Sequence, residues 1–203
     1  MIAIADCGMG NRRSVEKALA HVGADSVITS DHDAVRAADA VVLPGVGAFP
    51  EAMRNLRRSG LDELLRERAA AGVPLLGICL GMELLFDYSS EHEGAEGLGL
   101  LPGRVTPLHA PKVPHIGWNL VTMERSSPLT EGLPRAAAFY HVHSFACRPA
   151  DPADVVGWSE YGERFASIVQ RGNVMAAQFH PEKSSLDGLA LLRNFARLVV
   201  PVA

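Results

Sequence analysis

Apolar residues in the first 86 positions alternate between short continuous runs and runs with helical spacing. Continuous runs at 2–5, 40–43 and 74–78 suit strands buried on both faces, and a weaker run at 27–29 suits a further strand. Strands that alternate with helices predict a parallel sheet with right-handed crossovers. We expect the helices after Asn11, which can cap the first of them, and over 49–58, 61–71 and 80–86.

The pattern changes after Phe86. Residues 87–103 form a polar, glycine-containing stretch that predicts a loop, whereas 104–170 holds many prolines and short alternating segments typical of antiparallel strands. A last apolar strand at 173–179 precedes a helix with an apolar face. We therefore expect an α/β fold with a mostly parallel, flavodoxin-like sheet, flanking helices and a smaller antiparallel sheet, in one domain over 1–203.

Composition narrows the class of protein. The chain has 203 residues, 48% hydrophobic and 21% charged, which is ordinary for a soluble globular protein. A formal net charge of −4 argues against nucleic acid as the main partner. Cys7, Cys79 and Cys147 form no disulfide framework, and neither a secretory signal nor a membrane span is visible. We expect a cytoplasmic protein without nucleic-acid or membrane partners.

Cys79 carries the strongest chemical signal. It lies between the predicted strand 74–78 and a predicted helix, and Gly77 and Gly81 flank it. Gly-x-Cys-x-Gly at such a junction is the thiol form of the nucleophile elbow, in which a helix N-terminus favours thiolate. The alternative is a structural cysteine in an apolar turn, because free cysteines are commonly buried.

Candidate partners for Cys79 follow the last predicted strand. His180 can act as the general base and acid, and Glu182 can orient it, while Pro181 fixes the backbone between them. Oxyanion donors are expected from backbone N–H groups of Leu80 and of the glycine turn after strand 40–43, at Val46 or Gly47. These parts suit acyl transfer, but thiol proteases, esterases and amidases would all use them.

Longer motifs add a resemblance to a family. Gly77-Ile-Cys-Leu-Gly-Met-Glu83 and Gln178-Phe-His-Pro-Glu-Lys-Ser184 resemble the triad-type, class I glutamine amidotransferases. Within them, four further stretches resemble the glutaminase subunits of imidazole glycerol phosphate synthase: Asp6-Cys-Gly-Met-Gly-Asn-Arg-Arg-Ser-Val15, Pro44-Gly-Val-Gly-Ala-Phe49, Val113-Pro-His-Ile-Gly-Trp-Asn119 and Tyr140-His-Val-His-Ser144. The resemblance covers essentially the whole chain.

The resemblance implies a glutaminase that releases ammonia to a (βα)₈-barrel cyclase subunit and needs no metal or other cofactor. It makes Cys79 the nucleophile, His180 the base and Glu182 its orienting partner. Implied glutamine-pocket positions are Gly45, Glu83, Glu91, Ser144 and Phe145, and implied partner-facing positions are Asn11, Trp118, Tyr140 and Lys183.

Two residues depart from the family pattern. Glu83 stands where the family normally has glutamine, and a carboxylate there would repel the substrate's own carboxylate unless it is protonated or turned away. Cys7 stands where the family usually has tyrosine, for which we expect a packing adjustment only.

Other readings remain open at the sequence level. A stand-alone cysteine hydrolase would use the same triad without a partner, and other amidotransferase subunits, such as that of anthranilate synthase, are related alternatives. A non-enzymatic binding protein could use His141 and His143 to hold a metal, although packed or hydrogen-bonded histidines better fit a pair without a third ligand.

Overall fold

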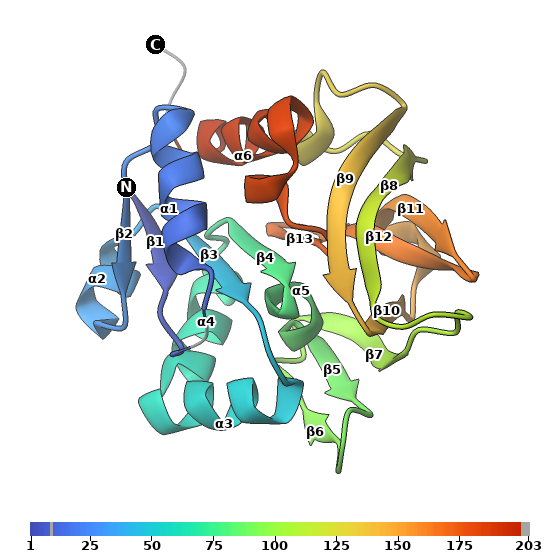
Figure 1. Ribbon diagram of the computed structural model, residues 1–203. Helices are drawn as coiled ribbons and strands as arrows, with labels where there is room; N and C mark the ends of the chain where they lie inside the picture. Colours follow the sequence, from blue (N-terminus) through green and yellow to red (C-terminus); the bar gives the residue numbers. More distant parts are fainter. Residues whose placement is uncertain (9, 200–203) are drawn as a thin grey trace.

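The computed structural model describes residues 1–8 and 10–199. Its centre is a nine-stranded sheet in the order β2-β1-β3-β4-β13-β12-β11-β8-β9, with a four-stranded sheet, β10-β7-β5-β6, packed at one end (Figure 1). The change from parallel to antiparallel pairing divides the large sheet into two halves.

The parallel half carries the elements that position the candidate nucleophile. Its strands are β2 (Ser26–Thr29), β1 (Ile2–Ala5), β3 (Ala40–Gly45), β4 (Leu75–Cys79) and β13 (Val174–Ala177). All residues of β1, β3, β4 and β13 are buried, as continuous apolar runs require. Their carboxyl ends meet at one edge of the sheet.

Helices cover both faces of this half (Figure 1). Apolar residues of α1 (Arg12–His21) and α6 (Ser185–Arg197), such as Leu19 and Phe195, pack on one face of the sheet. On the other face, α2 (His32–Ala37), α3 (Phe49–Ser59) and α4 (Leu61–Ala70) contribute Val35, Met53 and Leu64. Removing these apolar side chains from water on both faces is the main stabilising term of the fold.

The antiparallel half extends the sheet through β12 (Glu163–Arg171), β11 (Val155–Tyr161), β8 (His115–Met123) and β9 (Ala136–His143). The small sheet is built from β10 (Phe145–Pro149), β7 (Leu101–Pro107), β5 (Phe86–Ser89) and β6 (Ala95–Glu96). Short 3₁₀ turns lie at η1 (Pro128–Thr130), η2 (Pro152–Asp154) and η3 (Pro181–Lys183).

The α/β class and its two sheets agree with the sequence-based expectation, with differences in detail. The large sheet is mixed, because the antiparallel strands continue it beyond β13, and the small sheet includes one parallel pair, β5 with β7. The helix expected over 80–86 is α5 (Leu80–Leu84) and stops before Phe86, which begins β5. The loop expected at 87–103 contains β6 and most of β5, and α2 was not predicted.

No helix within the described residues is long and apolar enough to cross a bilayer.

Candidate active site

Cys79 occupies a strained turn between β4 and α5. Its φ of 55° and ψ of −113° place a non-glycine residue at positive φ, which is rarely populated. The flanking glycines are required by close packing: a Cβ added at Gly81 would lie 1.7 Å from the Leu43 carbonyl oxygen, and one at Gly77 would lie 2.7 Å from the Gly81 oxygen. The turn predicted as a nucleophile elbow is therefore held by close contact of strand and helix, with Cys79 buried at 6% exposure.

A cavity of about 350 Å³ opens where Cys79 lies. Most residues predicted for the site line it, namely Val46, Gly47, Cys79, Leu80, Glu83, Glu91, Ser144, Phe145, His180 and Lys183. Gly45 lies outside the lining but pairs with Cys79 across β3 and β4. The volume falls within the range of small-molecule pockets and suits a ligand as small as an amino acid.

The Cys79 thiol rests in a protonated state. Its Sγ donates to the Val142 carbonyl oxygen at 3.6 Å, and within the described residues it has no hydrogen bond to His180. Burial, with a smaller contribution from Glu83, raises the pKa of Cys79 well above its ordinary value, while a hydrogen bond with Leu80 N–H acts in the opposite direction. The expected helix-terminal thiolate is therefore wrong for the resting protein, because α5 has five residues and burial outweighs its terminus.

His180 and Glu182 form a buried pair behind the cavity. His180 Nδ1 lies 2.8 Å from Glu182 Oε1, and the two side chains are 2% and 0% exposed. A carboxylate only accepts, so in the neutral imidazole Nδ1 carries the proton and Nε2 is left as an acceptor. This is the protonation state that a general base needs.

Asn11 belongs to this pair. Its Nδ2 donates to Glu182 Oε1 at 2.7 Å and lies 3.3 Å from His180 Nδ1. The prediction that its side chain caps α1 is wrong, since the residue has a left-handed backbone and makes no capping hydrogen bond. The one functional role that sequence reasoning gave Asn11 was at a partner surface, whereas the structure puts its amide against the Glu182 carboxylate, which is hydrogen-bonded to His180.

Glu83 lies on the cavity wall and is 6% exposed. Its Oε1 accepts from Gln178 Nε2 at 3.0 Å, and no described cation lies within ion-pair distance of it. Burial first, then Glu91, raise the pKa of Glu83 to about 8, opposed by the Gln178 hydrogen bond. At neutral pH this side chain is mainly uncharged, which removes most of the repulsion expected from a carboxylate at this position.

Glu91 also lines the cavity and is held by two hydrogen bonds. Its Oε2 accepts from the Phe49 backbone N–H at 2.7 Å, and its own N–H donates to Ser89 Oγ at 3.2 Å. These bonds fix a carboxylate in the cavity that Ser144 and Phe145 also line, where it can receive an ammonium group.

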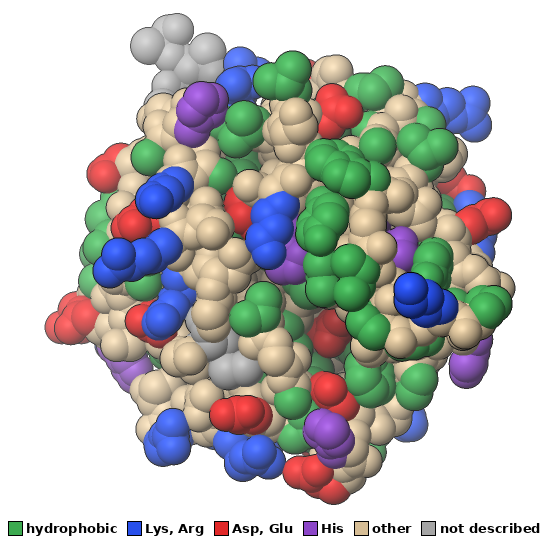
Figure 2. All heavy atoms as spheres, viewed as in Figure 1, with side chains coloured by type: hydrophobic (Ala, Val, Ile, Leu, Met, Phe, Trp, Pro, Cys, Tyr) green, Lys and Arg blue, Asp and Glu red, His purple; other side chains and the backbone are tan. Residues whose placement is uncertain are grey.

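Of the predicted partner-facing residues, Trp118 and Tyr140 lie on the β8–β9 hairpin, whereas Lys183 ends η3 and lines the cavity, and Asn11 precedes α1. Trp118 is 55% exposed and meets Tyr140 edge to face, with ring centroids 6.2 Å apart. Ile116 and Leu120, its neighbours on the same face of β8, are also exposed. Figure 2 shows hydrophobic side chains gathered over β8 and β9 in this view. We call Ile116, Trp118 and Leu120 the β8 strip.

Sequence reasoning missed three lining residues, Pro114, Val142 and His143. A signal was present for His143, because alternation along β9 puts His141 and His143 on the buried face. Both histidines are hydrogen-bonded: His143 to His115 and Phe145, and His141 to Phe139 and Ser167.

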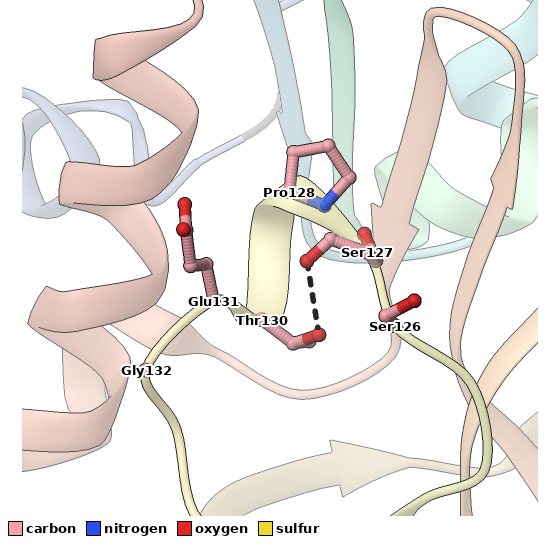
Figure 3. Close-up of a pocket in the computed structure, with 6 residues that line it drawn as sticks. All are labelled: Ser126, Ser127, Pro128, Thr130, Glu131 and Gly132. Atoms are coloured by element: carbon pink, nitrogen blue, oxygen red, sulfur yellow. Dashed lines mark hydrogen bonds between the residues drawn. The ribbon is translucent and has the colours of Figure 1, made fainter.

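Another hollow, of about 510 Å³, lies beside η1 (Figure 3). One loop, residues 126–132, supplies its lining, and the hydrogen bond drawn there joins Thr130 Oγ1 to the Ser127 oxygen. Glu131 is its one titratable lining residue. It brings together no nucleophile and base, so the cavity at Cys79 is the candidate active site.

Comparison with known proteins agrees with the geometry. The family model for class I glutamine amidotransferases matches residues 3–199. The HisH subunit of imidazole glycerol phosphate synthase from Moorella thermoacetica is 52% identical over 98% of this chain and 95% of its own length. That from Rhodopirellula baltica is 46% identical over the full length of both.

Solved structures support the fold. A glutamine amidotransferase crystal structure has a TM-score of 0.78 at 20% identity and covers 98% of each chain. The PurLQS structure from Thermotoga maritima has a TM-score of 0.76 at 19% identity, again with 98% of each chain covered. The chain belongs to the class I glutamine amidotransferase family and, within it, to the HisH subunits of imidazole glycerol phosphate synthase.

Proposed function

We propose that this chain hydrolyses L-glutamine to glutamate and ammonia with the triad Cys79, His180 and Glu182. The observation that carries the proposal is that Cys79 and His180 line one cavity while Glu182 holds the far side of the imidazole. A buried thiol, a base with a free Nε2 and an orienting carboxylate are the parts that thioester chemistry needs.

The reaction proceeds in two acyl transfers. The Cys79 thiol gives its proton to His180 Nε2 as sulfur attacks the side-chain carboxamide carbon of glutamine. His180 then passes the proton to the departing nitrogen, which leaves as ammonia. The γ-glutamyl group stays on Cys79 as a thioester. Water, deprotonated by His180, cleaves the thioester, and sulfur takes the proton back as glutamate departs.

Backbone N–H groups stabilise the negative oxygen that forms in each transfer. Leu80 N–H follows the nucleophile, and the turn of Val46 and Gly47 lines the cavity beside it. Gly47 has a φ of 106°, a conformation that glycine adopts easily, so reorienting this peptide costs little. We assign the oxyanion site to these groups.

The remaining lining residues hold the amino-acid end of glutamine. Glu91 accepts the α-ammonium, Ser144 and Phe145 border the carboxylate, and neutral Glu83 takes the place of an amide beside it. Gly45 supports this pocket from outside, because a Cβ there would press on Leu80 at 3.2 Å.

We further propose that the chain works as a heterodimer with a (βα)₈-barrel cyclase, which uses the ammonia to make imidazole glycerol phosphate and AICAR in histidine biosynthesis. The β8 strip, Tyr140, Lys183 and Asn11 would face the cyclase. An exposed apolar row with an aromatic pair is the kind of surface that a stable interface buries. Docking would also seal ammonia from water, where it is mostly protonated and unreactive.

The resting thiol gives a reason for partner control. Because Cys79 is protonated and donates to Val142 rather than to His180, slow turnover is expected until the partner shifts this arrangement. We also propose one glutaminase domain over 1–203 and a cytoplasmic location, a compartment in which buried cysteine thiols stay reduced.

The decisive experiment measures glutamate release by the isolated chain and by its complex with a matching cyclase and its nucleotide substrate. Hydrolysis should be slow alone and faster in the loaded complex. Cys79→Ala should abolish glutamine-dependent synthesis while added ammonia still supports the cyclase. Failure of ammonia to rescue, or equal rates with and without the partner, would contradict a partner-gated ammonia source.

A further inference from the structure

A chain of hydrogen bonds runs through the hairpin from its outer part to the cavity. His115 and His143 face each other across β8 and β9, and His115 Nδ1 lies 3.0 Å from His143 Nε2. His143 Nδ1 in turn lies 2.7 Å from the Phe145 carbonyl oxygen. At the other end, Asn119 Nδ2 lies 3.4 Å from His115 Nε2 and 3.0 Å from the Glu160 carbonyl oxygen.

The acceptor at one end fixes the direction of every bond. A carbonyl oxygen only accepts, so His143 Nδ1 carries a hydrogen and its Nε2 must accept from His115 Nδ1. His115 Nε2 is then an acceptor for the second hydrogen of Asn119 Nδ2. A charged His143 would place its Nε2–H against the His115 Nδ1–H, so the chain requires two neutral imidazoles, each with its proton on Nδ1.

The surroundings favour this state and hold the rings in place. Burial lowers the pKa of His143 to about 4 and also lowers the pKa of His115. The His115 ring is stacked between His141 and Tyr161, with centroids 4.9 and 4.0 Å away. A ring clamped on both faces cannot turn without breaking its contacts.

The Phe145 end of this hydrogen-bond chain lies where the backbone passes from the large sheet to the small one. β9 ends at His143 and β10 begins at Phe145, so Ser144 is the single residue between them. The Ser144 carbonyl accepts from Leu108 N–H at 2.9 Å, and the Phe145 carbonyl is held by His143. Both Ser144 and Phe145 line the cavity.

We propose that Asn119 and His115 are positioning residues that act through His143 to lock the Phe145 carbonyl, and so set the bend that presents Ser144 and Phe145 to the substrate. This role rests on the proposed glutaminase function, since it concerns the pocket for the amino-acid end of glutamine. Asn119, His115 and His143 would thus affect substrate binding and not the transfer of the proton from Cys79.

The existence of the hydrogen-bond chain is tested without substrate. Nitrogen-15 NMR of the imidazoles in the full-length protein at pH 7 should show both His115 and His143 with the proton on Nδ1, the rarer tautomer in water. A proton on Nε2 of either ring would overturn the proposal whether or not the protein hydrolyses glutamine.

The positioning role is tested by a matched set of variants. His115→Leu removes the donor to His143, whereas His115→Asn is similar in size and keeps a donor near the Nδ1 position. Loss of one hydrogen bond of this kind is worth about tenfold in binding, so His115→Leu should raise the KM for glutamine by about that factor with little change in kcat. His115→Asn should restore most of the wild-type KM.

His141→Leu is the control for mere packing, because His141 stacks on His115 but hydrogen-bonds elsewhere. Leucine keeps an apolar side chain against the His115 ring, and Tyr161 still stacks on that ring, so the KM of His141→Leu should stay near that of the wild type. Equal increases in KM for His115→Leu and His141→Leu, or no increase in the first, would overturn the positioning role. Absence of turnover in the wild-type complex would instead contradict the proposed function. The tautomers of His115 and His143 would still test whether the hydrogen-bond chain exists.

Discussion

At the scale of single residues, Glu83 places a carboxyl group with a raised pKa in the cavity that Cys79 also lines. The carboxyl faces the titratable groups Glu91, His143, His180, Lys183 and Cys79 around the cavity, and Cys147 lies on its Gln178 side. A carboxyl group is neutral below its pKa and gains a negative charge as the pH rises through that value. The Glu83 charge therefore appears near pH 8, where it would repel both a substrate carboxylate and the Cys79 thiolate.

Glu83→Gln tests this effect of pH. The KM of the wild type for glutamine should rise as pH increases through about 8, whereas the variant should show a flatter profile and an equal or lower KM at pH 7. Steady-state hydrolysis by the cyclase complex from pH 6.5 to 9.5 provides the comparison. A large loss of kcat in Glu83→Gln at pH 7 would instead give Glu83 an active chemical role.

Asn11 is the second residue whose contacts set a testable role. A hydrogen bond to a charged group contributes about 1.5–3 kcal/mol, so Asn11→Ala should lower kcat by at least about tenfold as Glu182 loses its donor. KM should change little, because Asn11 does not line the cavity. Lys17→Ala, an exposed change on the same helix, is the control. Full kcat in Asn11→Ala would mean that the bond has no part in orienting His180.

Residue chemistry could be read from sequence only in part. The elbow at Cys79 and the pair His180–Glu182 follow from local motifs, since glycines and strand ends mark them. Asn11 against Glu182, or Gln178 beside Glu83, depends on contacts across 171 and 95 positions that no local pattern encodes. The protonated resting thiol likewise depends on burial by distant elements, which overrides the helix terminus on which the thiolate expectation rested.

At the scale of elements, the junction of β4 and α5 is the most demanding contact. Gly81→Ala would force a Cβ to within 1.7 Å of the Leu43 carbonyl, an atom held in β3. Since overpacking commonly costs about 1–3 kcal/mol and a backbone clash costs more, the free energy of unfolding should fall by at least about 3 kcal/mol. Denaturant unfolding of the isolated chain measures this loss.

Gly23→Ala is the matched control. Its φ of 83° is strained for alanine, but no atom lies within 4 Å of the added Cβ. Left-handed backbone costs a non-glycine residue about 1–2 kcal/mol, so the loss should be smaller than for Gly81→Ala. Equal losses of unfolding free energy in the two variants would contradict the idea that the close approach of Gly81 to β3 requires glycine there.

Element prediction succeeded where burial made the pattern simple. The fully buried runs of β1, β3 and β4 are apolar throughout, and α3 and α4 carry clear stripes. It failed at α2, a six-residue helix with one buried residue, Val35, because one apolar position has no period. Similarly, the small-sheet strands β5 and β6 are short and partly exposed, so their polar residues were taken for a loop.

At the scale of the whole molecule, strand β9 joins the proposed partner surface to the proposed catalytic groups. Its Tyr140 carbonyl accepts from His180 N–H at 2.9 Å, and its Val142 carbonyl receives the Cys79 thiol. On β8, Trp118 and Ile116 lie opposite these two residues. A partner bound to the β8 strip would contact Trp118 and Ile116. Each of these pairs with one β9 residue, and that residue's carbonyl is hydrogen-bonded to His180 or Cys79.

Trp118→Ala should weaken cyclase binding without harming the isolated chain. Buried aromatic anchors cost about 2 kcal/mol or more when truncated, which is about thirtyfold in affinity. Isothermal titration with the cyclase measures the affinity, and basal glutamate release checks the isolated chain. Val27→Ala, on the opposite edge strand β2, should change neither. Unchanged cyclase affinity in Trp118→Ala would move the interface off the β8 strip.

The most direct measurement of the central claim locates the nucleophile. A chloroketone analogue of glutamine should alkylate the cyclase-bound wild-type chain on Cys79, as found by peptide mass spectrometry, with inactivation slowed by glutamine. Cys79→Ala should remain unlabelled, leaving Cys7 and Cys147 unmodified. Stoichiometric inactivation with the label on another residue, or equal labelling of Cys79→Ala, would contradict the assignment of Cys79 as the sulfur that opens the carboxamide.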